Sequence, residues 1–366
     1  MLYFYGNQCN VLSRCFLTSR QKRNPMSQQK TTIHDVAQAA GVSVSTVSLV
    51  LSGKGRISAA TAARVNQAIE ALGYIRNRSA SVLRGGESGV IGLIVRDLSQ
   101  PFYAAMTAGL SEVLEQQGKV LVLTQSGQHG QQLQRCFDSL AAQGVDGIVL
   151  GGAVAQAETL VAQAQEQNIA LICAARASSL DTIDSLRPDN SQAARIATEY
   201  LIRQGHQRIA WLGGLGSSLT RAERIGGYCA TLLQYGLPFR PDWIIECDER
   251  QQSVSALTQT LLHHHPRITA ILAHNASTTL GCYFGALHSG RTMGEEAVDS
   301  YYTQQLALVG FNDDPQREVN DPALTFVSSE ARDVGRRAAE RMLQRLAQPD
   351  AEIQTLIVPP RLVRSG

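Results

Sequence analysis

Residues 31–74 read TTIHDVAQAAGVSVSTVSLVLSGKGRISAATAARVNQAIEALGY. Their apolar residues recur at helical spacing in three short segments, and no alternating pattern typical of a strand lies between them. Thr32 and Asp35 form a variant capping box, with aspartate in place of the usual glutamate or glutamine. This pair predicts a first helix that ends at Ala40 and is followed by a turn.

The second and third helices have start signals of their own. Ser43 can cap a helix from Val44 to about Leu51, and Ser58 can cap a third helix that ends at Gly73. Two short helices around a glycine-containing turn, followed by a third, predict a helix-turn-helix unit.

The second helix has two chemically different faces. A helical wheel groups its larger aliphatic residues on one arc that we expect to pack on the other helices: Val47, Val50 and Leu51. The opposite face carries two hydroxyls and one leucine: Ser45, Ser48 and Leu49. Such a face suits the DNA major groove, where hydroxyls bond base edges and an apolar side chain touches the thymine methyl. A protein-interaction module with a solvated serine face is the alternative.

Charge is distributed unevenly along the 366 residues. The net charge is +2, but residues 1–25 carry +4, residues 26–86 carry +5 and residues 87–366 carry −7. Lys and Arg gain affinity for nucleic acids by releasing counterions condensed on phosphates. The basic front end therefore predicts binding to a polyanion. Because Met26 opens a natural protein start just before the first helix, we expect residues 1–25 to be a disordered extension or a mis-assigned start.

After residue 86 the pattern changes to short β-branched runs that alternate with helical stretches. This alternation is typical of βαβ units with buried parallel sheets. About 280 residues of this pattern exceed one hydrophobic core, so we expect two lobes. The strand candidates are residues 90–95, 120–124, 147–150, 170–173, 209–212, 244–247, 270–273 and 306–309.

Residues 77–86, NRSASVLRGG, connect the two parts. Asn77 can cap one or two helical turns, which are too short to persist alone in water. Leu83, flanked by Arg78 and Arg84, can enter a minor groove as an apolar wedge while the arginines neutralise phosphates. An ordinary basic linker is the alternative.

Several classes of protein are disfavoured. The seven cysteines are scattered without a CxxC pair, which fits a reducing cytosol, and no apolar run approaches the ~18 residues of a membrane span. The loop GGLGSS at 213–218 lacks the third glycine of a dinucleotide loop, and three histidines at 263–265 read as a solvated helix end. We expect no catalysis, cofactor or metal.

Two rival functions are a nicotinamide-dependent sugar oxidoreductase and a secreted sugar receptor. The basic front end disfavours the first, and the missing signal peptide disfavours the second.

The sequence resembles the lactose/galactose-repressor (LacI/GalR) family. The strongest motif is TIHDVA at 32–37, followed by AGVS at 40–43 and TVS at 46–48. Further motifs follow in family order: PFY at 101–103, GVDGI at 144–148, DN at 189–190, GH at 205–206, GY at 227–228 and GFN at 310–312. Many spaced motifs in one order are far more specific than any one of them.

The resemblance implies three parts with different tasks. These are a helix-turn-helix DNA-binding domain at 26–75, a hinge helix or linker at 76–88, and a two-lobed effector-binding and dimerisation domain at 89–366, built like a periplasmic sugar-binding protein. It implies a cytoplasmic, nucleoid-associated repressor that binds a pseudo-palindromic operator as a homodimer and responds to a small carbohydrate. No heptad segment ends the sequence, so we expect a dimer and not a tetramer. The implied DNA-binding residues are Ser45, Thr46, Ser48, Leu49, Ser58, Thr61, Arg78 and Leu83.

Many relatives carry arginine at the position of Leu49. Leucine cannot make the bidentate guanine contact that arginine makes.

The resemblance also implies effector-binding residues in the core. In the core, Ala276 stands where an acidic residue is common, and Asn312 replaces a common aspartate. Arg176 is an additional candidate that can pair with an anionic or hydroxyl-rich ligand. The implied effector-binding residues are Asp97, Phe102, Arg176, Arg224, Asn275 and Asn312, and they predict a carbohydrate-like effector without identifying it.

Overall fold

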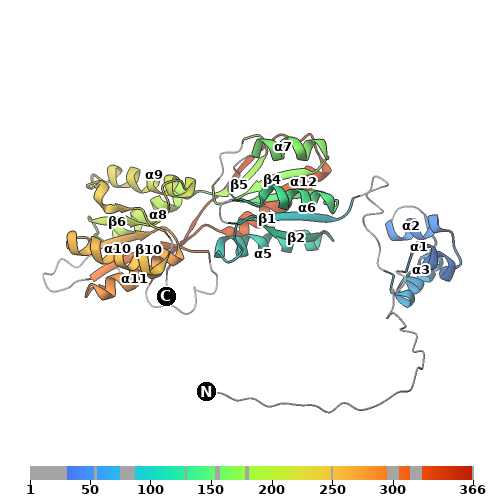
Figure 1. Ribbon diagram of the computed structural model, residues 1–366, viewed down its shortest axis with the longest axis horizontal. Coiled ribbons are helices and arrows are strands. Elements are labelled where there is room, and N and C mark those ends of the chain that lie inside the picture. The colour runs from blue at the N-terminus through green and yellow to red at the C-terminus, as the bar shows by residue number, and fades with distance from the viewer. Residues whose placement is uncertain are drawn as a thin grey trace, which may run out of the picture. The chain divides into compact units, whose positions relative to one another are not determined.

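The computed structural model describes residues 31–52, 56–74, 87–127, 130–152, 157–177, 181–248, 250–294, 305–313 and 324–364. The chain divides into two compact units, Met1–Asn77 and Arg78–Gly366 (Figure 1). The predicted extension at 1–25 and the hinge residues Arg78 and Leu83 lie outside the described residues. Within the described part of the chain, no helix is both long enough and apolar enough to cross a membrane.

The first unit contains the three predicted helices: α1 (Ile33–Ala40), α2 (Val44–Ser52) and α3 (Ala59–Leu72). The capping box is present, because the Thr32 N–H donates to Asp35 Oδ2 at 2.7 Å and the Asp35 N–H donates to Thr32 Oγ1 at 3.4 Å. Gly73 ends α3 in the left-handed region at φ 57°, where a glycine carries no Cβ penalty. The small core of this unit consists of Val36, Ala37, Ala40, Val47, Val65 and Ala68.

The first lobe of the second unit is a six-stranded parallel sheet in the order β12-β5-β4-β3-β1-β2. Helices α5 and α12 pack against one face of this sheet, and α6 and α7 pack against the other. The strands are β1 (Val90–Val95), β2 (Val120–Gln125), β3 (Gly147–Gly151), β4 (Ala170–Ala174), β5 (Asp184–Pro188) and β12 (Thr355–Val358). The helices are α5 (Pro101–Gln116), α6 (Leu133–Ala142), α7 (Ala157–Glu166) and α12 (Ala331–Ala347).

The second lobe has a sheet in the order β13-β11-β10-β8-β6-β7, with β9 beside β10 and one antiparallel pair, β11 with β13. Helices α8 and α9 cover one face, and α10 and α11 cover the other. The strands are β6 (Ile209–Leu212), β7 (Ile244–Ile245), β8 (Ala270–Ala273), β9 (Thr292–Met293), β10 (Gln305–Phe311), β11 (Thr325–Ser328) and β13 (Arg361–Val363). The helices are α8 (Asn190–Arg203), α9 (Leu219–Gln234), the short 3-10 helix Pro241–Trp243, α10 (Gln251–His264) and α11 (Ala276–His288).

All eight predicted strands are confirmed, although β7 ends two residues before the predicted limit of 247. Cys247 instead forms an isolated antiparallel bridge with Gly214. The prediction missed five strands: β5, β9, β11, β12 and β13. Most of these are short, and β5 reads Asp-Ser-Leu-Arg-Pro, which lacks the apolar run that identifies a buried strand.

The chain passes between the lobes three times, after β5, after β11 and after β12. Backbone and side-chain contacts tie these crossings together. The Asp189 N–H donates to the Val358 carbonyl at 3.0 Å, and Arg361 Nε donates to Glu330 Oε1 at 3.0 Å. Glu330 lies in the left-handed region at φ 50°, which is uncommon for a residue with a Cβ.

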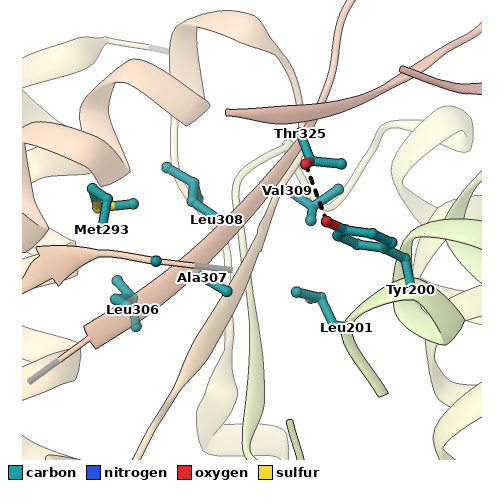
Figure 2. A pocket seen from close by; sticks show the side chains of 9 residues that line it. Tyr200, Leu201, Met293, Leu306, Ala307, Leu308, Val309 and Thr325 are labelled. Carbon is teal, nitrogen blue, oxygen red and sulfur yellow. Dashed lines mark hydrogen bonds between the residues drawn. The ribbon is translucent and has the colours of Figure 1, made fainter. Parts of the chain in front are cut away.

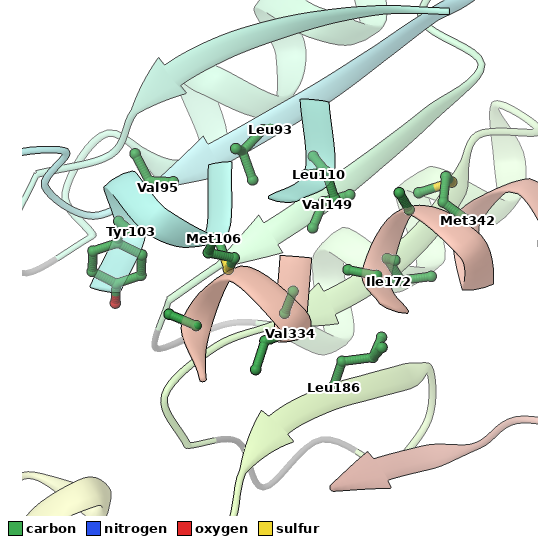
Figure 3. Packing of buried hydrophobic residues seen from close by; sticks show 14 of the residues in the cluster. Leu93, Val95, Tyr103, Met106, Leu110, Val149, Ile172, Leu186, Val334 and Met342 are labelled. Atoms are coloured by element: carbon green, nitrogen blue, oxygen red, sulfur yellow. The ribbon is translucent and has the colours of Figure 1, made fainter. Parts of the chain in front are cut away.

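Helices α5 and α12 come from opposite ends of the second unit and pack closely. A Cβ at Gly109 would overlap the Arg332 carbonyl oxygen, and a Cβ at Gly335 would overlap the Met106 carbonyl oxygen. Figure 3 shows the apolar layer between these helices and the sheet, where Met106 of α5 and Val334 of α12 face the strand residue Ile172. The first lobe therefore needs the C-terminal part of the chain for its core.

A buried carboxylate fixes the same C-terminal part to the sheet. Asp184 is 1% exposed and accepts from Arg341 Nη2 at 2.7 Å, from Arg345 Nη2 at 2.8 Å and from the Gln354 N–H at 2.9 Å. Burial raises the pKa of Asp184, but the hydrogen bonds from Arg341, the Gln354 N–H and Arg345 together hold it below its ordinary value. The carboxylate thus joins β5, α12 and the start of β12.

We predict that Asp184→Asn lowers the free energy of unfolding by about 3–5 kcal/mol at neutral pH, because Arg341, 2% exposed, loses its charged partner. Urea unfolding followed by circular dichroism measures this loss. Asp333→Asn is the matched control on α12; it removes an exposed pair with Arg337 and costs about 1 kcal/mol or less.

The loss also depends on pH. Because the folded pKa of Asp184 is depressed, its stabilisation is present above the unfolded pKa of about 3.9 and disappears as pH falls through the folded pKa. The difference in free energy of unfolding between wild type and Asp184→Asn should become smaller as the pH falls. If Asp184→Asn costs no more free energy of unfolding than Asp333→Asn at neutral pH, the stabilising role of Asp184 is contradicted.

Candidate DNA-binding face and effector site

Helix α2 exposes the face that the sequence predicts. Val47 is fully buried in the core of the first unit, and Val50 and Leu51 pack partly against it. On the opposite side Ser45 is exposed and Leu49 is 41% exposed. The helical-wheel prediction of one packed face and one outward face is therefore confirmed.

Hydroxyl groups at the start of α2 form a local network. Ser43 Oγ accepts from the Thr46 N–H at 3.2 Å, which confirms Ser43 as the cap of this helix. The same oxygen lies 2.8 Å from Ser45 Oγ and 2.9 Å from Thr46 Oγ1. The network brings the Ser45 and Thr46 hydroxyls within hydrogen-bond distance of Ser43 Oγ.

The start of α3 is built in the same way. Ser58 Oγ accepts from the Thr61 N–H at 3.2 Å and lies 2.9 Å from Thr61 Oγ1. Both residues sit in the first turn of the helix, where backbone N–H groups and the helix dipole favour an anion such as a phosphate. Capping therefore does not conflict with the predicted approach of Ser58 and Thr61 to the DNA backbone.

On the first lobe, the predicted effector residues follow the carboxyl ends of β1 and β4. Ligands bind at this edge of open parallel sheets. Asp97 Oδ1 accepts from the Ser99 N–H at 2.9 Å and from Ser99 Oγ at 2.6 Å. This oxygen therefore stabilises the turn that carries Asp97 itself. The Arg176 guanidinium lies over the Phe102 ring at 5.2 Å and the Tyr103 ring at 5.8 Å from the ring centres. Phe102 is fully buried, so the structure places it beneath Arg176 and within the core.

On the second lobe, Arg224 is the most constrained of the predicted residues. It is 3% exposed, its Nη1 donates to the His274 carbonyl at 2.6 Å, and its Nε donates to Asn190 Oδ1 at 3.2 Å. The guanidinium also lies over the Phe311 ring at 4.1 Å. These contacts fix its position at the carboxyl ends of β8 and β10.

Asn275 and Asn312 occupy the same edge of the second sheet. Asn275 caps α11, because its Oδ1 accepts from the Thr278 N–H at 2.8 Å. Asn312 is buried, and its backbone N–H donates to the Val327 carbonyl at 3.1 Å. The helix cap thus uses the side-chain carbonyl oxygen of Asn275.

Sequence reasoning missed a network that joins the lobes. Asn190 Nδ2 donates to the Arg176 carbonyl at 2.6 Å and to Glu223 Oε2 at 2.7 Å. Arg187 of the first lobe donates to Glu223 of the second lobe at 2.9 Å. The DN motif at 189–190 was the signal for Asn190, whereas no pattern around Glu223 marked it out.

Burial, and after it the charges of nearby arginines, shift the pKa values of two inter-lobe residues, His274 and Asp313. Burial, followed by the charges of Arg224, Arg176 and Arg221, holds the pKa of His274 well below its ordinary value. Burial raises the pKa of Asp313, against the opposing effect of Arg176. His274 is therefore neutral at physiological pH, and its Nδ1 is buried without a hydrogen-bond partner.

Other places in the described part of the chain are poor candidates for a metal site, a cofactor site or a ligand pocket. Among the described residues no three His, Cys, Asp or Glu side chains gather as metal ligands. In the GGLGSS loop the Gly216 N–H donates to Glu246 Oε1 at 2.7 Å, and a carboxylate at that amide repels a cofactor phosphate. Figure 2 shows a cavity between α8 and β10, near the 3.5 Å contact of Thr325 with Tyr200, but its volume of about 10 Å³ admits roughly one water molecule.

Two family models match the chain. Residues 32–77 match the bacterial regulatory proteins of the lacI family, and residues 88–365 match the periplasmic binding proteins and sugar binding domain of the LacI family. The matches confirm the predicted helix-turn-helix headpiece and the predicted two-lobed core with parallel sheets.

Individual proteins agree with the family models. Within the family, the stretches VSVSTVSLVLSGKGRIS at 42–58 and GHQRIAWLGG at 205–214 resemble a maltose-regulon repressor. The maltose regulon regulatory protein MalI of Escherichia coli (strain K12) is 55% identical over 335 residues, which cover 92% of this chain and 98% of MalI. This identity confirms the resemblance.

Solved structures give the same result. The lac repressor dimer bound to operator and the anti-inducer ONPF is similar with a TM-score of 0.78 at 27% identity, covering 92% of this chain and 99% of that chain. The complex of the transcriptional regulator CelR with cellobiose is similar with a TM-score of 0.66 at 29% identity, covering 92% and 100%. The chain therefore belongs to the LacI family of bacterial regulatory proteins, as a DNA-binding transcription regulator with a sugar-binding effector domain and not as an enzyme.

Proposed function

We propose that this regulator is a repressor that binds a pseudo-palindromic operator as a homodimer, and that a small carbohydrate between its lobes changes its affinity for DNA. Residues 26–75 bind the major groove, residues 76–88 form the hinge, and residues 89–366 bind the effector and the second chain. The protein acts on the nucleoid in the cytoplasm. The observation that carries this proposal is the outward face of α2, where Leu49 is exposed while Val47 is buried.

The exposed face of α2 supports sequence-specific binding. Ser45, Thr46 and Ser48 offer hydroxyls to base edges, and Leu49 offers an apolar contact to a thymine methyl. Ser58 and Thr61 position the headpiece through phosphates, which carry no sequence information. The hinge residues Arg78 and Leu83 contact the operator centre, the first through phosphates and the second as a minor-groove wedge.

The inter-lobe residues support a carbohydrate effector. Asp97, Phe102 and Arg176 come from the first lobe, and Arg224, Asn275 and Asn312 come from the second. Hydroxyl-rich ligands need several fixed donors and acceptors, which the polar side chains among these residues supply. Phe102 contributes from within the core, because its ring lies beneath the Arg176 guanidinium. MalI is named for the maltose regulon and CelR is bound to cellobiose, so a glucose-containing sugar is the first class to test.

We predict that Leu49→Arg changes the preferred base at one position in each half-site. The arginine guanidinium can bind guanine bidentately, whereas leucine makes an apolar contact with a thymine methyl. A good bidentate pair between a side chain and a base is worth about 1–3 kcal/mol of discrimination against the wrong base. Selection from a randomised operator library measures the preference. Leu72→Arg is the control, because Leu72 is similarly exposed at 38% but lies at the end of α3. Identical base preferences for Leu49→Arg and wild type would refute the role of Leu49.

We predict a dimer at micromolar concentration, because a twofold protein matches a twofold operator. Multi-angle light scattering of the full chain should give twice the mass of one chain without DNA, and that mass plus one operator duplex with DNA. A monomer would contradict the proposed mode of binding, and a tetramer would contradict the predicted assembly.

We predict that Leu83→Ala weakens operator binding and reduces the coupling between effector and operator, which is typically about 1–3 kcal/mol. The hinge is too short to be helical alone, so it orders only where paired hinges meet the operator. Calorimetry with sugar, alone and with operator, measures the coupling, since each ligand must change the affinity for the other equally. The affinity of the DNA-free protein for sugar should be unchanged. Loss of that affinity would contradict the role of the hinge. So would an operator affinity and a coupling that Leu83→Ala leaves unaltered.

A further inference from the structure

Helices α8 and α9 of the second lobe form one closely packed block. A Cβ at Gly227 of α9 would overlap the Ser191 carbonyl oxygen of α8, so the two backbones are in contact. Ser191 Oγ also donates to the Glu223 carbonyl of α9 at 3.2 Å. Helices packed this closely move together when one lobe shifts against the other.

Two side chains of this block, Asn190 and Glu223, reach the first lobe. Asn190, the first residue of α8, is 1% exposed, and its Nδ2 donates to the Arg176 carbonyl at 2.6 Å. Glu223 of α9 accepts at Oε1 from Arg187 Nη1 at 2.9 Å. Arg176 follows β4 and Arg187 lies on β5, so both hydrogen bonds cross between the lobes.

The same two side chains are bonded to each other and to Arg224. Asn190 Nδ2 also donates to Glu223 Oε2 at 2.7 Å, and Asn190 Oδ1 accepts from Arg224 Nε at 3.2 Å. One orientation of the amide satisfies these contacts, because carbonyl and carboxylate oxygens need its N–H₂ group and the guanidinium needs its oxygen. Donor therefore meets acceptor at each contact of Asn190.

A change in lobe orientation has to lengthen or break the two bonds that cross between the lobes. The bond from Arg224 to Asn190 lies within the second lobe and can survive such a change. The bond from Asn190 to the Arg176 carbonyl cannot, because its two ends belong to different lobes. The network thus holds the Arg176 backbone at a set position relative to the Arg224 guanidinium.

We propose that Asn190 and Glu223 are positioning residues of the inter-lobe effector site. They hold Arg176 of the first lobe and Arg224 of the second lobe in the relative placement that the ligand needs, and they resist a change in lobe orientation. The inference rests on the proposed function, since it concerns the same site. A site whose groups are already in place binds more tightly, because binding then costs less ordering.

Two single substitutions and their combination test the pairing of donors and acceptors. Asn190→Asp sets a second carboxylate against Glu223, because the amide N–H₂ group becomes an oxygen. Glu223→Gln sets an N–H₂ group against a donor, either Asn190 Nδ2 or the Arg187 guanidinium. In the double variant the new glutamine amide can donate to the new aspartate carboxylate, so donor and acceptor match again.

Isothermal titration calorimetry of the purified full chain with maltose, cellobiose and glucose measures effector affinity. We expect each single substitution to weaken sugar binding about tenfold, and the double variant to recover to within about threefold of wild type. Recovery is incomplete because the Arg176 carbonyl still lacks its donor. Ser191→Ala is the matched control: it removes a hydrogen bond between the same two helices that does not reach the first lobe, and it should leave sugar affinity unchanged.

Operator affinity without sugar is the second measurement. Fluorescence anisotropy would use an operator selected from the randomised library, after circular dichroism has shown that each variant is folded. Both single substitutions disturb the same lobe orientation, so we expect operator affinity to change about threefold or more in the same direction, and to be restored in the double variant. General damage to the fold would not be reversed by a second substitution.

Each other outcome overturns a stated part. Single variants that bind sugar as tightly as wild type or more tightly overturn the positioning role and leave the carbohydrate effector standing. A double variant that binds sugar no better than the weaker single variant overturns the pairing of Asn190 with Glu223. An operator affinity that neither single substitution changes overturns the resistance to lobe movement. If wild type binds none of the three sugars, the carbohydrate effector is overturned, and the operator measurement alone decides the role of the two residues.

Discussion

The Asp184 carboxylate joins the three segments of the first lobe that lead to or from the crossings between lobes. It lies on β5, and its partners are Arg341 and Arg345 of α12 and the Gln354 N–H before β12. Each of these segments continues into or out of the second lobe within a few residues. The proposed effector residues stand on both lobes, so their positions depend on the segments that lead into the crossings. The Asp184 carboxylate holds three of these segments together.

The two units differ in the size of their hydrophobic cores. The first unit has a core of six small and medium apolar residues and relies on caps at Thr32, Ser43 and Ser58. On this small unit, α2 packs Val47 into the core and leaves Ser45 and Leu49 exposed on its opposite face. The second unit has four large cores, one on each face of two sheets, and can hold buried charges such as Arg224 without losing its fold.

Local sequence reveals apolar strands and capped helices, because their signals lie within a few residues. The eight strands with continuous apolar runs were predictable in this way, and so was the outward position of Leu49. Strand β5 was not, because Asp184 reads as a surface residue until Arg341, more than 150 positions later, neutralises it. The same holds for the effector site: family motifs marked Arg224 and Asn190, but the link from Asn190 to the Arg176 carbonyl depends on tertiary structure. Glu223 carries no sequence signal at all, since only the fold brings it opposite Arg187.

Both sheets receive a strand from the last part of the sequence, β12 in one lobe and β13 in the other. On the ribosome, synthesis proceeds from the N-terminus and domains fold as they emerge. The three helices of the first unit are complete once residue 73 has left the exit tunnel, whereas neither sheet can close before residues 355–363 follow. A nascent chain therefore has its DNA-reading helices folded long before it has a lobe able to sense a sugar.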